Sequence, residues 1–499
     1  MSTVHNRVRA GFYLDSVALM RLSQTITARS GVVEAALMIG TPANRAILDD
    51  AGLLVADGRA AGPNDLILAL RAADHAAAEA ALDAADALLD RPAAGSGGGA
   101  RWRPRTLAAA IDALDGANLA LISVPGAFAA GEARMALARG LNVMIFSDNV
   151  AVADERALKA EAAERGLLVM GPDCGTALIG GVPLAFANAV PRGDIGLIAA
   201  SGTGLQEVSC LIARAGGGVS HGIGVGGRDL GQAVGGLSTL AAIDLLDADP
   251  ATRHVVLISK PPAAGVADKV IDRIARASKS FTVCLIGAET LALPANARFA
   301  ATLADAAADA LGGAPVAAPP AATLARARAS RGDGRRWIHG LYTGGTLAAE
   351  AQVILRAAGV SVASNAPIPG ADTLEGGRDG GHRILDLGAD EYTVGRPHPM
   401  IEPNVRVPEL ARSLADPSVA VVLVDVVLGF GAHPDPAGAV AAAVAAAPAS
   451  RPAVVASVCG TDGDPQNLAA QIARLESADI IVAGANARAV EAAIVIARG

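Results

Sequence analysis

The chain has 499 residues, which is too long for one hydrophobic core, because single cores stop growing at roughly 250 to 300 residues; three or four domains are expected. A formal net charge of -8 and the lack of a basic stripe argue against a nucleic-acid partner, which needs clustered Lys and Arg. The N-terminus lacks the apolar core of a signal peptide, and Ala-rich runs are interrupted well before membrane-spanning length, so a cytoplasmic protein without a membrane partner is expected.

The composition favours α/β layers. Hydrophobic residues make up 52% of the chain but aromatic residues only 2%, so the cores must consist of helices packed closely on sheets with few large side chains. The four cysteines are widely spaced without a CxxC pair, which indicates free thiols and no zinc framework: Cys174, Cys210, Cys284 and Cys459.

The first domain is expected over residues 1–92. Strand patterns at 8–15, 32–40 and 65–71 alternate with helical patterns and predict a small α/β unit. The Gly/Pro/Arg-rich stretch "RPAAGSGGGARWRPR" follows, and we assign a linker to residues 93–105.

The second domain is expected over residues 106–192, where near-continuous apolar strands alternate with helices and indicate parallel strands covered on both faces. Ligands of such sheets lie at the carboxyl ends of the strands. There "GPDCGT" could present Asp173 and Cys174 to a substrate, although a free cysteine behind a strand is more often a small buried hydrophobe.

Two further domains share one layout. They span residues 193–313 and 336–499, separated by the Ala/Pro-rich linker 314–335, which shows no coherent period. "GLIAASGTGLQEV" and "HGLYTGGTLAAEA" are each a strand, a turn of small residues, and a helix with an early Glu. The two turns are therefore candidates for paired sites.

Such turns suit an anion. A helix start leaves N–H groups without intrahelical partners and carries roughly half a positive charge, so a phosphate fits there. The candidate phosphate-binding residues are Ser201, Gly202, Thr203 and Gly204 in one turn and Gly344, Gly345 and Thr346 in the other. The alternative is that Ser201 or Thr203 only caps its helix. No GxxxxGK[ST] loop is present, which argues against nucleotide hydrolysis.

Two cations follow strands in the third domain. Lys260 in "ISKPP" could neutralise an anionic ligand, or be a solvated strand end. Arg228 in the glycine-rich "VGGRDLGQAVGG" could hold a carboxylate bidentately, or form a structural pair with Asp229.

Polar residues gather past a strand at "LDLGADEYTVGRPHPMI". Asp390, Glu391, Arg396 and His398 could form an acid-base or anion-holding cluster, or lie in an ordinary rigid loop. The spacing of His398, His433, Asp435 and Asp464 does not fix a coordination geometry, so no metal site is assigned.

Several segments of the chain resemble those of a known family. "LISVPGAF", "GLNVMIFSDNV" and "LLVMGPDCG", followed by "GDIGLIAASGTGLQEV", look like the CoA-binding and first ligase domains of the succinyl-CoA synthetase α subunit. "LYTGGTLAAEA" and "VAVVLVDVVLGFGAHPD" are similar to the ligase domain of its β subunit. Over nearly its whole length the chain resembles the FdrA family, which implies a Rossmann-like CoA-binding-type domain and two flavodoxin-like ligase domains after the N-terminal unit.

The resemblance also implies site roles. In the synthetases two helix N-termini, one from each ligase domain, face each other across a phosphate, and Glu207 falls where the family has an acidic residue close to the phosphorylated group. The chain departs from the synthetases because "AETLALPANARFAATLADAA" contains no His to be phosphorylated. It also lacks the glycine-rich opening of a CoA domain, which argues against bound CoA, and no cofactor is assigned.

The resemblance implies a subunit of oxamate carbamoyltransferase in allantoin breakdown, converting N-carbamoyl-oxamate (oxalurate) and phosphate to oxamate and carbamoyl phosphate. Phosphate and carbamoyl phosphate are then substrates, other subunits are the partners, and the catalytic candidates are Glu207, Lys260, Arg228 and His398. The alternatives are an acyl-CoA synthetase with a nonstandard nucleophile and a noncatalytic subunit that binds a metabolite.

Overall fold

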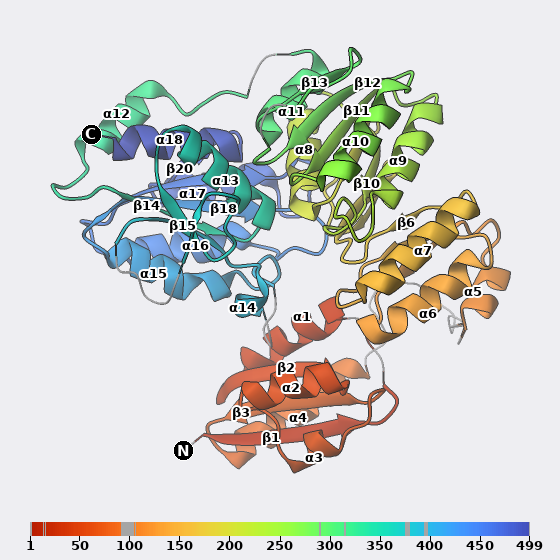
Figure 1. Ribbon diagram of the computed structural model, residues 1–499. Helices are drawn as coiled ribbons and strands as arrows, with labels where there is room; N and C mark the ends of the chain where they lie inside the picture. Colours follow the sequence, from red (N-terminus) through yellow and green to blue (C-terminus); the bar gives the residue numbers. More distant parts are fainter. Residues whose placement is uncertain are drawn as a thin grey trace. The chain divides into compact units, whose positions relative to one another are not determined.

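The computed structural model describes residues 2–12, 14, 16–90, 104, 106–288, 291–313, 316–374, 380–393 and 398–498, without the side chains of residues 16, 17 and 43. The chain forms two compact units (Figure 1). The smaller unit contains Met1–Ala117, Ser123–Phe128 and Asp390–Glu402, and the larger unit contains the rest. The expected linker 93–105 lies, apart from Pro104, outside the described residues.

The smaller unit is built on an antiparallel three-stranded sheet with the strand order β1-β3-β2. Its elements are β1 (Thr3–Arg9), α1 (Ser16–Thr27), β2 (Val32–Ile39), α2 (Pro42–Asp50), α3 (Ala56–Ala60), β3 (Leu66–Ala72), α4 (His75–Leu89) and α5 (Leu107–Ala113). Because side chains alternate along a strand, Leu66, Leu68 and Leu70 of β3 pack with α1 and α4. Ile67 and Ala69 pack in a second cluster with Leu48 of α2.

The predicted first strand was wrong. A strand was expected over residues 8–15, whereas β1 covers Thr3–Arg9. The sequence "TVHNRVR" carries polar side chains on both faces of the strand, so it lacks the apolar alternation that usually marks a strand. Asn6, for example, is buried and donates from Nδ2 to the Leu53 carbonyl at 2.7 Å.

The segment Asp390–Glu402, which includes α14 (Asp390–Thr393), belongs to the smaller unit although it is remote from it in sequence. Gln24 on α1 donates from Nε2 to the Ile401 carbonyl at 3.0 Å.

The larger unit begins with a three-stranded parallel sheet in the order β4-β5-β6. Its elements are β4 (Leu119–Ile122), α6 (Gly126–Leu137), β5 (Asn142–Ile145), α7 (Val152–Glu164) and β6 (Val169–Met170). The hairpin of β7 (Thr176–Ile179) and β8 (Val182–Ala185) does not join this sheet, because β7 pairs antiparallel with β10 of the next one. The boundary expected at residue 192 therefore differs from the sheet structure.

Two seven-stranded sheets form the repeated domains, in the orders β13-β12-β11-β9-β10-β7-β8 and β16-β15-β17-β14-β18-β19-β20. The first repeat domain contains β9 (Ile195–Ala199), α8 (Gly202–Arg214), β10 (Val219–Gly224), α9 (Leu237–Ala248), β11 (His254–Ser259), α10 (Ala264–Ala275), β12 (Ser280–Leu285), β13 (Ala297–Phe299) and α11 (Leu303–Leu311). The second repeat domain contains β14 (Trp337–Tyr342), α13 (Gly345–Ala357), β15 (Val362–Ser364), β16 (Asp372–Thr373), β17 (His382–Asp386), α15 (Val407–Ala415), β18 (Val419–Val427), α16 (Pro436–Ala445), β19 (Ala453–Cys459), α17 (Leu468–Ser477), β20 (Ile481–Ala483) and α18 (Asn486–Ala497).

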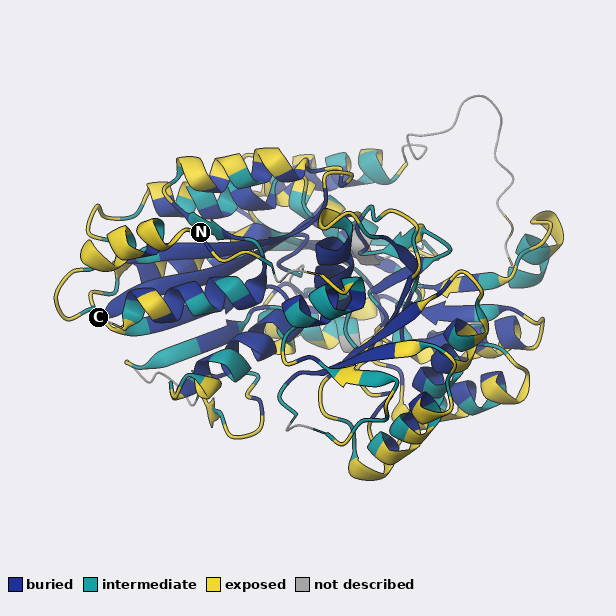
Figure 2. Ribbon diagram, turned by 90° about the horizontal axis from the view of Figure 1, so that it is seen from above, coloured by how far each residue is buried: buried dark blue, intermediate teal, exposed yellow. Residues whose placement is uncertain are grey.

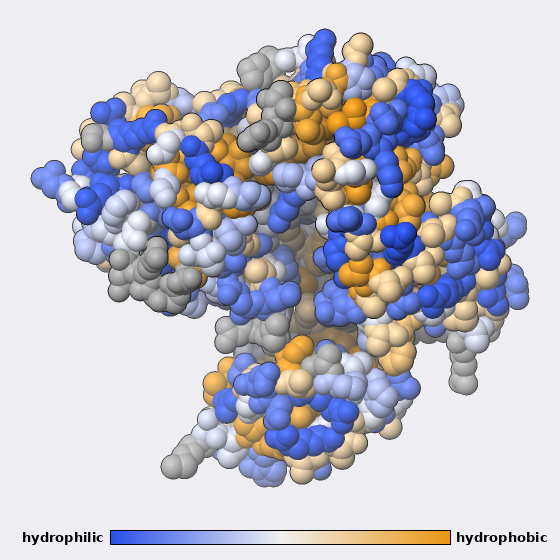
Figure 3. All heavy atoms as spheres, in the orientation of Figure 1, coloured by the Kyte–Doolittle hydropathy of each residue, from blue (hydrophilic) through white to orange (hydrophobic). Residues whose placement is uncertain are grey.

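The expected α/β class is confirmed. Central strands such as β9, β11 and β18 are buried along their whole length, as strands covered by helices on both faces must be. In Figure 2 strands of the sheets are dark blue, whereas helices that cover them are yellow on parts of their outer faces. In Figure 3 much of the surface over α5 and α7 is hydrophilic.

In the part of the chain that the structure describes, the repeat domains contact each other through helices. α8 packs against α13, and α11 packs against α18, so the helix that follows each central strand meets its counterpart. No helix in the described part of the chain is both long enough and apolar enough to cross a membrane.

The linker prediction for residues 314–335 was wrong in part, because α12 (Ala321–Ala329) lies within it. Alanine and arginine favour helix, and α12 gains tertiary support by packing on α18. Leu324 is buried in that contact, and Arg331 beyond the helix donates to the Ala497 carbonyl at 2.5 Å.

Candidate anion site at two converging helix starts

The two predicted turns lie together although they are 145 residues apart. The hydroxyls of Ser201 and Thr346 share a hydrogen bond between the start of α8 and the start of α13. Ser201 is also the N-cap of α8, since its Oγ accepts from the Gly204 N–H at 3.2 Å. Ser201 therefore both caps α8 and contacts the start of α13.

A buried ion pair fixes the backbone of the second turn. The Asp425 carboxylate on β18 accepts from the N–H groups of Thr343 and Gly344 at 2.8 and 2.9 Å. Arg406 donates from NH1 to Asp425 Oδ1 at 3.0 Å, and both side chains are fully buried. Burial raises the pKa of Asp425, and the adjacent guanidinium and the donors of the turn oppose that shift. This network fixes the backbone from which α13 begins.

Glycine is required where the helix starts approach each other. A Cβ on Gly344 would lie 2.9 Å from Thr203 Cγ2, and a Cβ on Gly345 would lie 2.6 Å from Asp386 Oδ2. Side chains at these positions would push the two turns apart or displace Asp386.

The arrangement can attract an anion. Helix geometry leaves the N–H groups of Gly202 and Thr203, and those of Gly345 and Thr346, without intrahelical partners. Two positively polarised helix ends that meet also repel each other, and an anion between them would relieve that repulsion. The carboxylate of Asp386 beside Gly345 opposes an anion on that side, so the donors of α8 and the two hydroxyls are the more favourable contacts.

Glu207 does not face the turn. It lies six residues after Ser201 on α8, about 9 Å along the helix axis at 1.5 Å per residue. Its Oε1 accepts from the backbone N–H of Asn486 at 3.1 Å and so caps α18 of the other repeat domain. The predicted catalytic role of Glu207 is therefore not supported by its position.

Glu350 is the counterpart of Glu207 on α13. Its Oε1 accepts from the Leu303 N–H at 2.7 Å and caps α11, and its Oε2 accepts from Asn486 Nδ2 at 2.7 Å. Burial raises the pKa of Glu350 to about 7, and burial also raises the pKa of Glu207. Each repeat domain thus supplies a carboxyl group that completes a helix start in the other.

The predicted cations of the first repeat domain have different surroundings. Lys260 is exposed directly after β11, and the nearby Ile258 carbonyl accepts from the Ala200 N–H at 2.9 Å, so Lys260 lies at the strand edge that carries α8. Arg228 instead pairs with Glu155 at 2.9 Å and donates to the Val150 carbonyl at 2.9 Å, which favours a structural role.

Asp229 is not the partner of Arg228. It is buried, forms an ion pair with Lys159 at 2.8 Å, and accepts from the N–H groups of Ser238 and Thr239 at the start of α9. The structural pair expected within "GGRDLG" is therefore replaced by two separate pairs.

The "GPDCGT" loop is close to the start of α8. A Cβ on Gly202 would lie 2.9 Å from Thr176 Oγ1. Asp173 is exposed and adopts a left-handed backbone with φ 57°. Cys174 is buried and its thiol donates to the Thr176 carbonyl at 3.5 Å, which supports the alternative of a small buried side chain rather than a substrate contact. Burial raises the pKa of Cys174 to about 12.

The third predicted group belongs to the smaller unit, whereas both turns belong to the larger one. Asp390 and Glu391 are exposed in α14. The imidazole of His398 accepts from the Met400 N–H at 3.2 Å, and burial lowers the pKa of His398 to about 4. Arg396 lies outside the described residues.

Sequence reasoning missed three polar residues near the turns: Thr176, Asp386 and Asp425. Asp386 carried a usable signal, since it ends β17 in "RILD" and the carboxyl edge of a parallel sheet is where ligands lie. Asp425 carried a weaker one, as a lone charge within the apolar strand "VAVVLVDVV".

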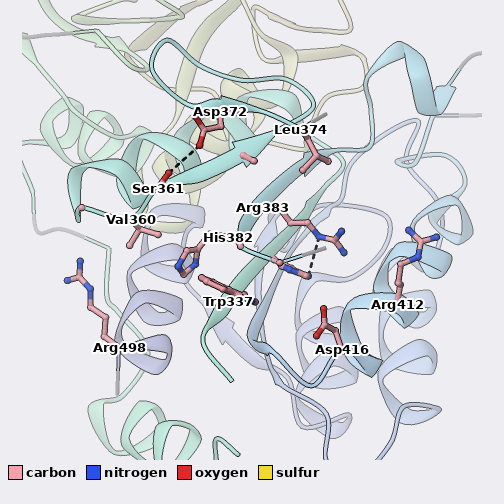
Figure 4. Close-up of a pocket in the computed structure, with 15 residues that line it drawn as sticks. Trp337, Val360, Ser361, Asp372, Leu374, His382, Arg383, Arg412, Asp416 and Arg498 are labelled. Atoms are coloured by element: carbon pink, nitrogen blue, oxygen red, sulfur yellow. Dashed lines mark hydrogen bonds between the residues drawn. The ribbon is translucent and has the colours of Figure 1, made fainter. Parts of the chain in front are cut away.

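A pocket of about 540 Å³ lies at the opposite edge of the second repeat domain. Trp337 and His382, which begin β14 and β17, line it together with Arg383, Arg412 and Asp416 (Figure 4). Arg383 donates from Nε to His339 Nδ1 at 3.2 Å, and burial lowers the pKa of His339 to about 3. Because α13 starts at the carboxyl end of β14, this pocket and the paired turns are separate.

Comparisons with known proteins match separate parts of the chain and its whole length. A family model described as "CoA-ligase" matches residues 341–496, and a model described as "AllF, heavy metal-associated domain" matches residues 1–104. The Escherichia coli (strain K12) protein named "Uncharacterized protein YahF" is 41% identical over 494 residues, covering 96% of this chain and 96% of its own.

More distant relatives match in part. The succinate–CoA ligase [ADP-forming] subunit alpha of Aquifex aeolicus is 29% identical over 154 residues, or 29% of this chain, and the chain spans 48% of that subunit. Among solved structures, the dinucleotide-forming acetyl-coenzyme A synthetase 1 of Ca. Korarchaeum cryptofilum is 18% identical, covers 78% of this chain and 84% of its own, and has a TM-score of 0.34.

Proposed function

The chain belongs to the FdrA-type family of YahF and has CoA-ligase-like domains, and from this premise we propose that it is a subunit of a carbamoyltransferase that uses inorganic phosphate directly. The observation that carries the proposal is the hydrogen bond between Ser201 and Thr346, which joins two helix starts of opposite repeat domains. The match of residues 1–104 to a domain named for AllF supports a role in ureide breakdown.

The absence of a histidine supports direct use of phosphate. Residues 288–307, which follow the strand where the synthetases carry their phosphorylated His, contain none. A covalent phosphohistidine cannot form there, and a phosphate held by the helix starts remains free to act as a nucleophile.

In the proposed reaction a phosphate oxygen attacks the carbamoyl carbon of oxalurate. The carbon–nitrogen bond to the oxamate portion breaks, the electron pair stays on that nitrogen, and a proton neutralises it, so the products are carbamoyl phosphate and oxamate. One of the backbone N–H groups of Gly202 and Thr203 would bind the phosphate, and the other would stabilise the negative charge that develops on the carbamoyl oxygen. Binding both reactants at one site contributes further to the rate.

Lys260 is the remaining catalytic candidate of the first repeat domain. Its exposed ammonium follows β11 at the same strand edge as α8 and would neutralise the phosphate or the substrate carboxylate. Other subunits would supply the remaining acid-base chemistry, because Glu207 and Arg228 are engaged in structural contacts.

The test uses the full chain, affinity-purified from its own cells together with the proteins that bind it. The complex is incubated with oxalurate and phosphate, and carbamoyl phosphate is trapped as citrulline by ornithine carbamoyltransferase. We expect phosphate-dependent citrulline, reduced at least tenfold in a complex carrying Ser201→Ala and Thr346→Val. An assembled complex that forms no citrulline would contradict the proposal.

The CoA-ligase match at residues 341–496 favours acyl-CoA synthesis as the second candidate. This function predicts tight CoA binding and release of CoA thioester from an acyl donor. Calorimetric titration of the same complex with CoA separates the two candidates, because direct transfer to phosphate requires no CoA.

A further inference from the structure

A second potential ligand site lies in the smaller unit, on residues with no part in the proposed function. Among the residues that the structure describes, the ligand atoms of His5, His75 and Glu79 lie within 4.8 Å of one another. The imidazole rings of His5 and His75 have their centroids 5.1 Å apart at an interplanar angle of 32°. Two imidazoles and a carboxylate form a donor set suited to divalent metal ions such as Zn²⁺.

The secondary structure explains why these side chains meet. Alternation along β1 turns His5, Arg7 and Arg9 toward α4, because they occupy every second position. On α4 the acidic and imidazole side chains repeat every three or four residues and form one stripe. That stripe consists of His75, Glu79, Asp83 and Asp86, with Asp90 directly after the helix.

The two arginines of β1 form ion pairs with successive carboxylates of this stripe. Arg9 pairs with Asp86 and Asp90. Arg7 pairs with Glu79, Asp83 and Asp86 at 2.7 to 2.8 Å. Two residues before Arg7, the same face of β1 carries His5 instead of an arginine, and its ring lies beside that of His75. A bound metal ion would occupy the place that the guanidinium groups occupy further along the strand.

The charge of this region suits a divalent cation. The stripe carries four carboxylates, whereas β1 offers two guanidinium groups, so two negative charges remain. His75 is exposed, and His5 and Glu79 are partly exposed, so an ion can reach the site from solvent.

The donor set also restricts which metal fits. Residues 1–104, which match the model of a heavy metal-associated domain, contain no cysteine, so thiolate ligation of soft ions is excluded in this domain. Both histidines of residues 1–104 belong to the cluster. We propose that His5, His75 and Glu79 bind one borderline divalent transition-metal ion, with a water molecule completing a tetrahedral shell.

The contacts that His5 and Glu79 make in the structure leave room for a metal ion to replace or share them. His5 Nε2 shares a hydrogen bond with Thr3 Oγ1 at 3.0 Å, which a metal ion can displace. Arg7 pairs with Glu79 through Oε2 at 2.7 Å, and a carboxylate has a second oxygen that can ligate a metal ion.

The experiment is a calorimetric titration of the tag-free, chelator-treated full chain with Zn²⁺, repeated with Co²⁺ while its absorption spectrum is recorded. We expect one ion per chain and the intense visible bands of tetrahedral Co²⁺. His5→Ala and His75→Ala should each weaken Zn²⁺ binding at least tenfold and abolish the Co²⁺ bands. Asp83→Asn is the matched control, because it removes a charge and a partner of Arg7 from the same stripe without removing a ligand.

Circular dichroism and thermal unfolding establish that each variant is folded. Absence of binding at millimolar Zn²⁺, or binding that His5→Ala and His75→Ala leave unchanged, would overturn the proposal. An equal loss in Asp83→Asn and His75→Ala would overturn it too, since only the general charge of the stripe would then matter. None of these outcomes depends on the carbamoyltransferase proposal.

Discussion

Glu207 and Glu350 occupy equivalent positions in the two repeat domains, six residues after Ser201 and Gly344, and each caps the last helix of the opposite domain. Asn486 contacts both carboxyl groups, through its backbone N–H to Glu207 and its side chain to Glu350. The helices whose starts converge are therefore tied together again further along their length. This reciprocal arrangement fixes the relative orientation of the two starts.

Removal of the Glu350 side chain should destabilise the larger unit strongly. Glu350→Ala leaves the Leu303 N–H without its acceptor and leaves Asn486 Nδ2 with the Leu347 carbonyl alone, and the loss of both buried hydrogen bonds costs about 3 kcal/mol in the free energy of unfolding. Urea denaturation followed by circular dichroism measures this loss. Glu476→Ala, on the exposed side of α17, serves as the control and should change the free energy by less than about 0.5 kcal/mol. Equal stability of the two variants would contradict the reciprocal capping.

Stability should depend on pH through Glu350. Its pKa is about 7 in the folded chain, above the ordinary Glu value of 4.5, so the folded state retains a proton that the unfolded state has released. The free energy of unfolding contributed by this group therefore falls as pH rises from about 4.5 to about 7 and is constant above that.

The matched variant is Glu350→Gln, which cannot titrate. Relative to this variant, the natural chain should lose up to about 3 kcal/mol between pH 4.5 and pH 8, at 1.36 kcal/mol per pKa unit. Urea midpoints of both proteins across this range measure the difference. Parallel pH profiles would show that folding does not raise the pKa of Glu350 and would contradict the prediction.

Phosphate affinity should depend on the close approach at the start of α13. Gly345→Ala places a methyl group 2.6 Å from Asp386 Oδ2, so the carboxylate or the start of α13 must shift, and phosphate binding should weaken at least tenfold. Gly265→Ala is the matched control at the start of α10, because a Cβ there meets no atom within 4 Å. Calorimetric titration with phosphate compares them, and equal affinities would separate the anion site from this turn.

The thiols should be inert in the folded chain. All four cysteines are buried, and burial raises the pKa of Cys174, Cys210 and Cys284, so few thiolates form near neutral pH. Titration with a chromogenic disulfide reagent should modify fewer than one thiol per native chain and four after denaturation. Rapid modification of a thiol in the native chain would show that its region opens.

Regular patterns in the sequence predicted the fold better than the site. The apolar strands and the repeated turn layout were sufficient for the α/β class, because buried parallel strands need continuous apolar runs. β1 was misplaced because its polar residues are paired with α4 and with Leu53, which no local pattern reveals. α12 was missed because an Ala-rich segment is stabilised as a helix only by its packing on α18.

The site was predictable only where local geometry determined it. A small-residue turn before a helix marks a helix start, so the sequence pointed to the turns of Ser201 and Thr346, which contact each other, and their role in binding phosphate stays a prediction. Glu207 was predicted as a catalytic residue, whereas its carboxyl group accepts from Asn486, which lies 279 residues away in the other repeat domain and which no local pattern reveals. Partners at such separations follow from tertiary packing alone.

The most direct test of the central claim is a crystal structure of the full chain grown with phosphate at a saturating concentration. We predict a phosphate ion at the start of α8, within hydrogen-bond distance of the Ser201 and Thr346 hydroxyls and of the Gly202 or Thr203 N–H groups. A crystal in which the Ser201–Thr346 contact persists and phosphate is absent from both helix starts would contradict it.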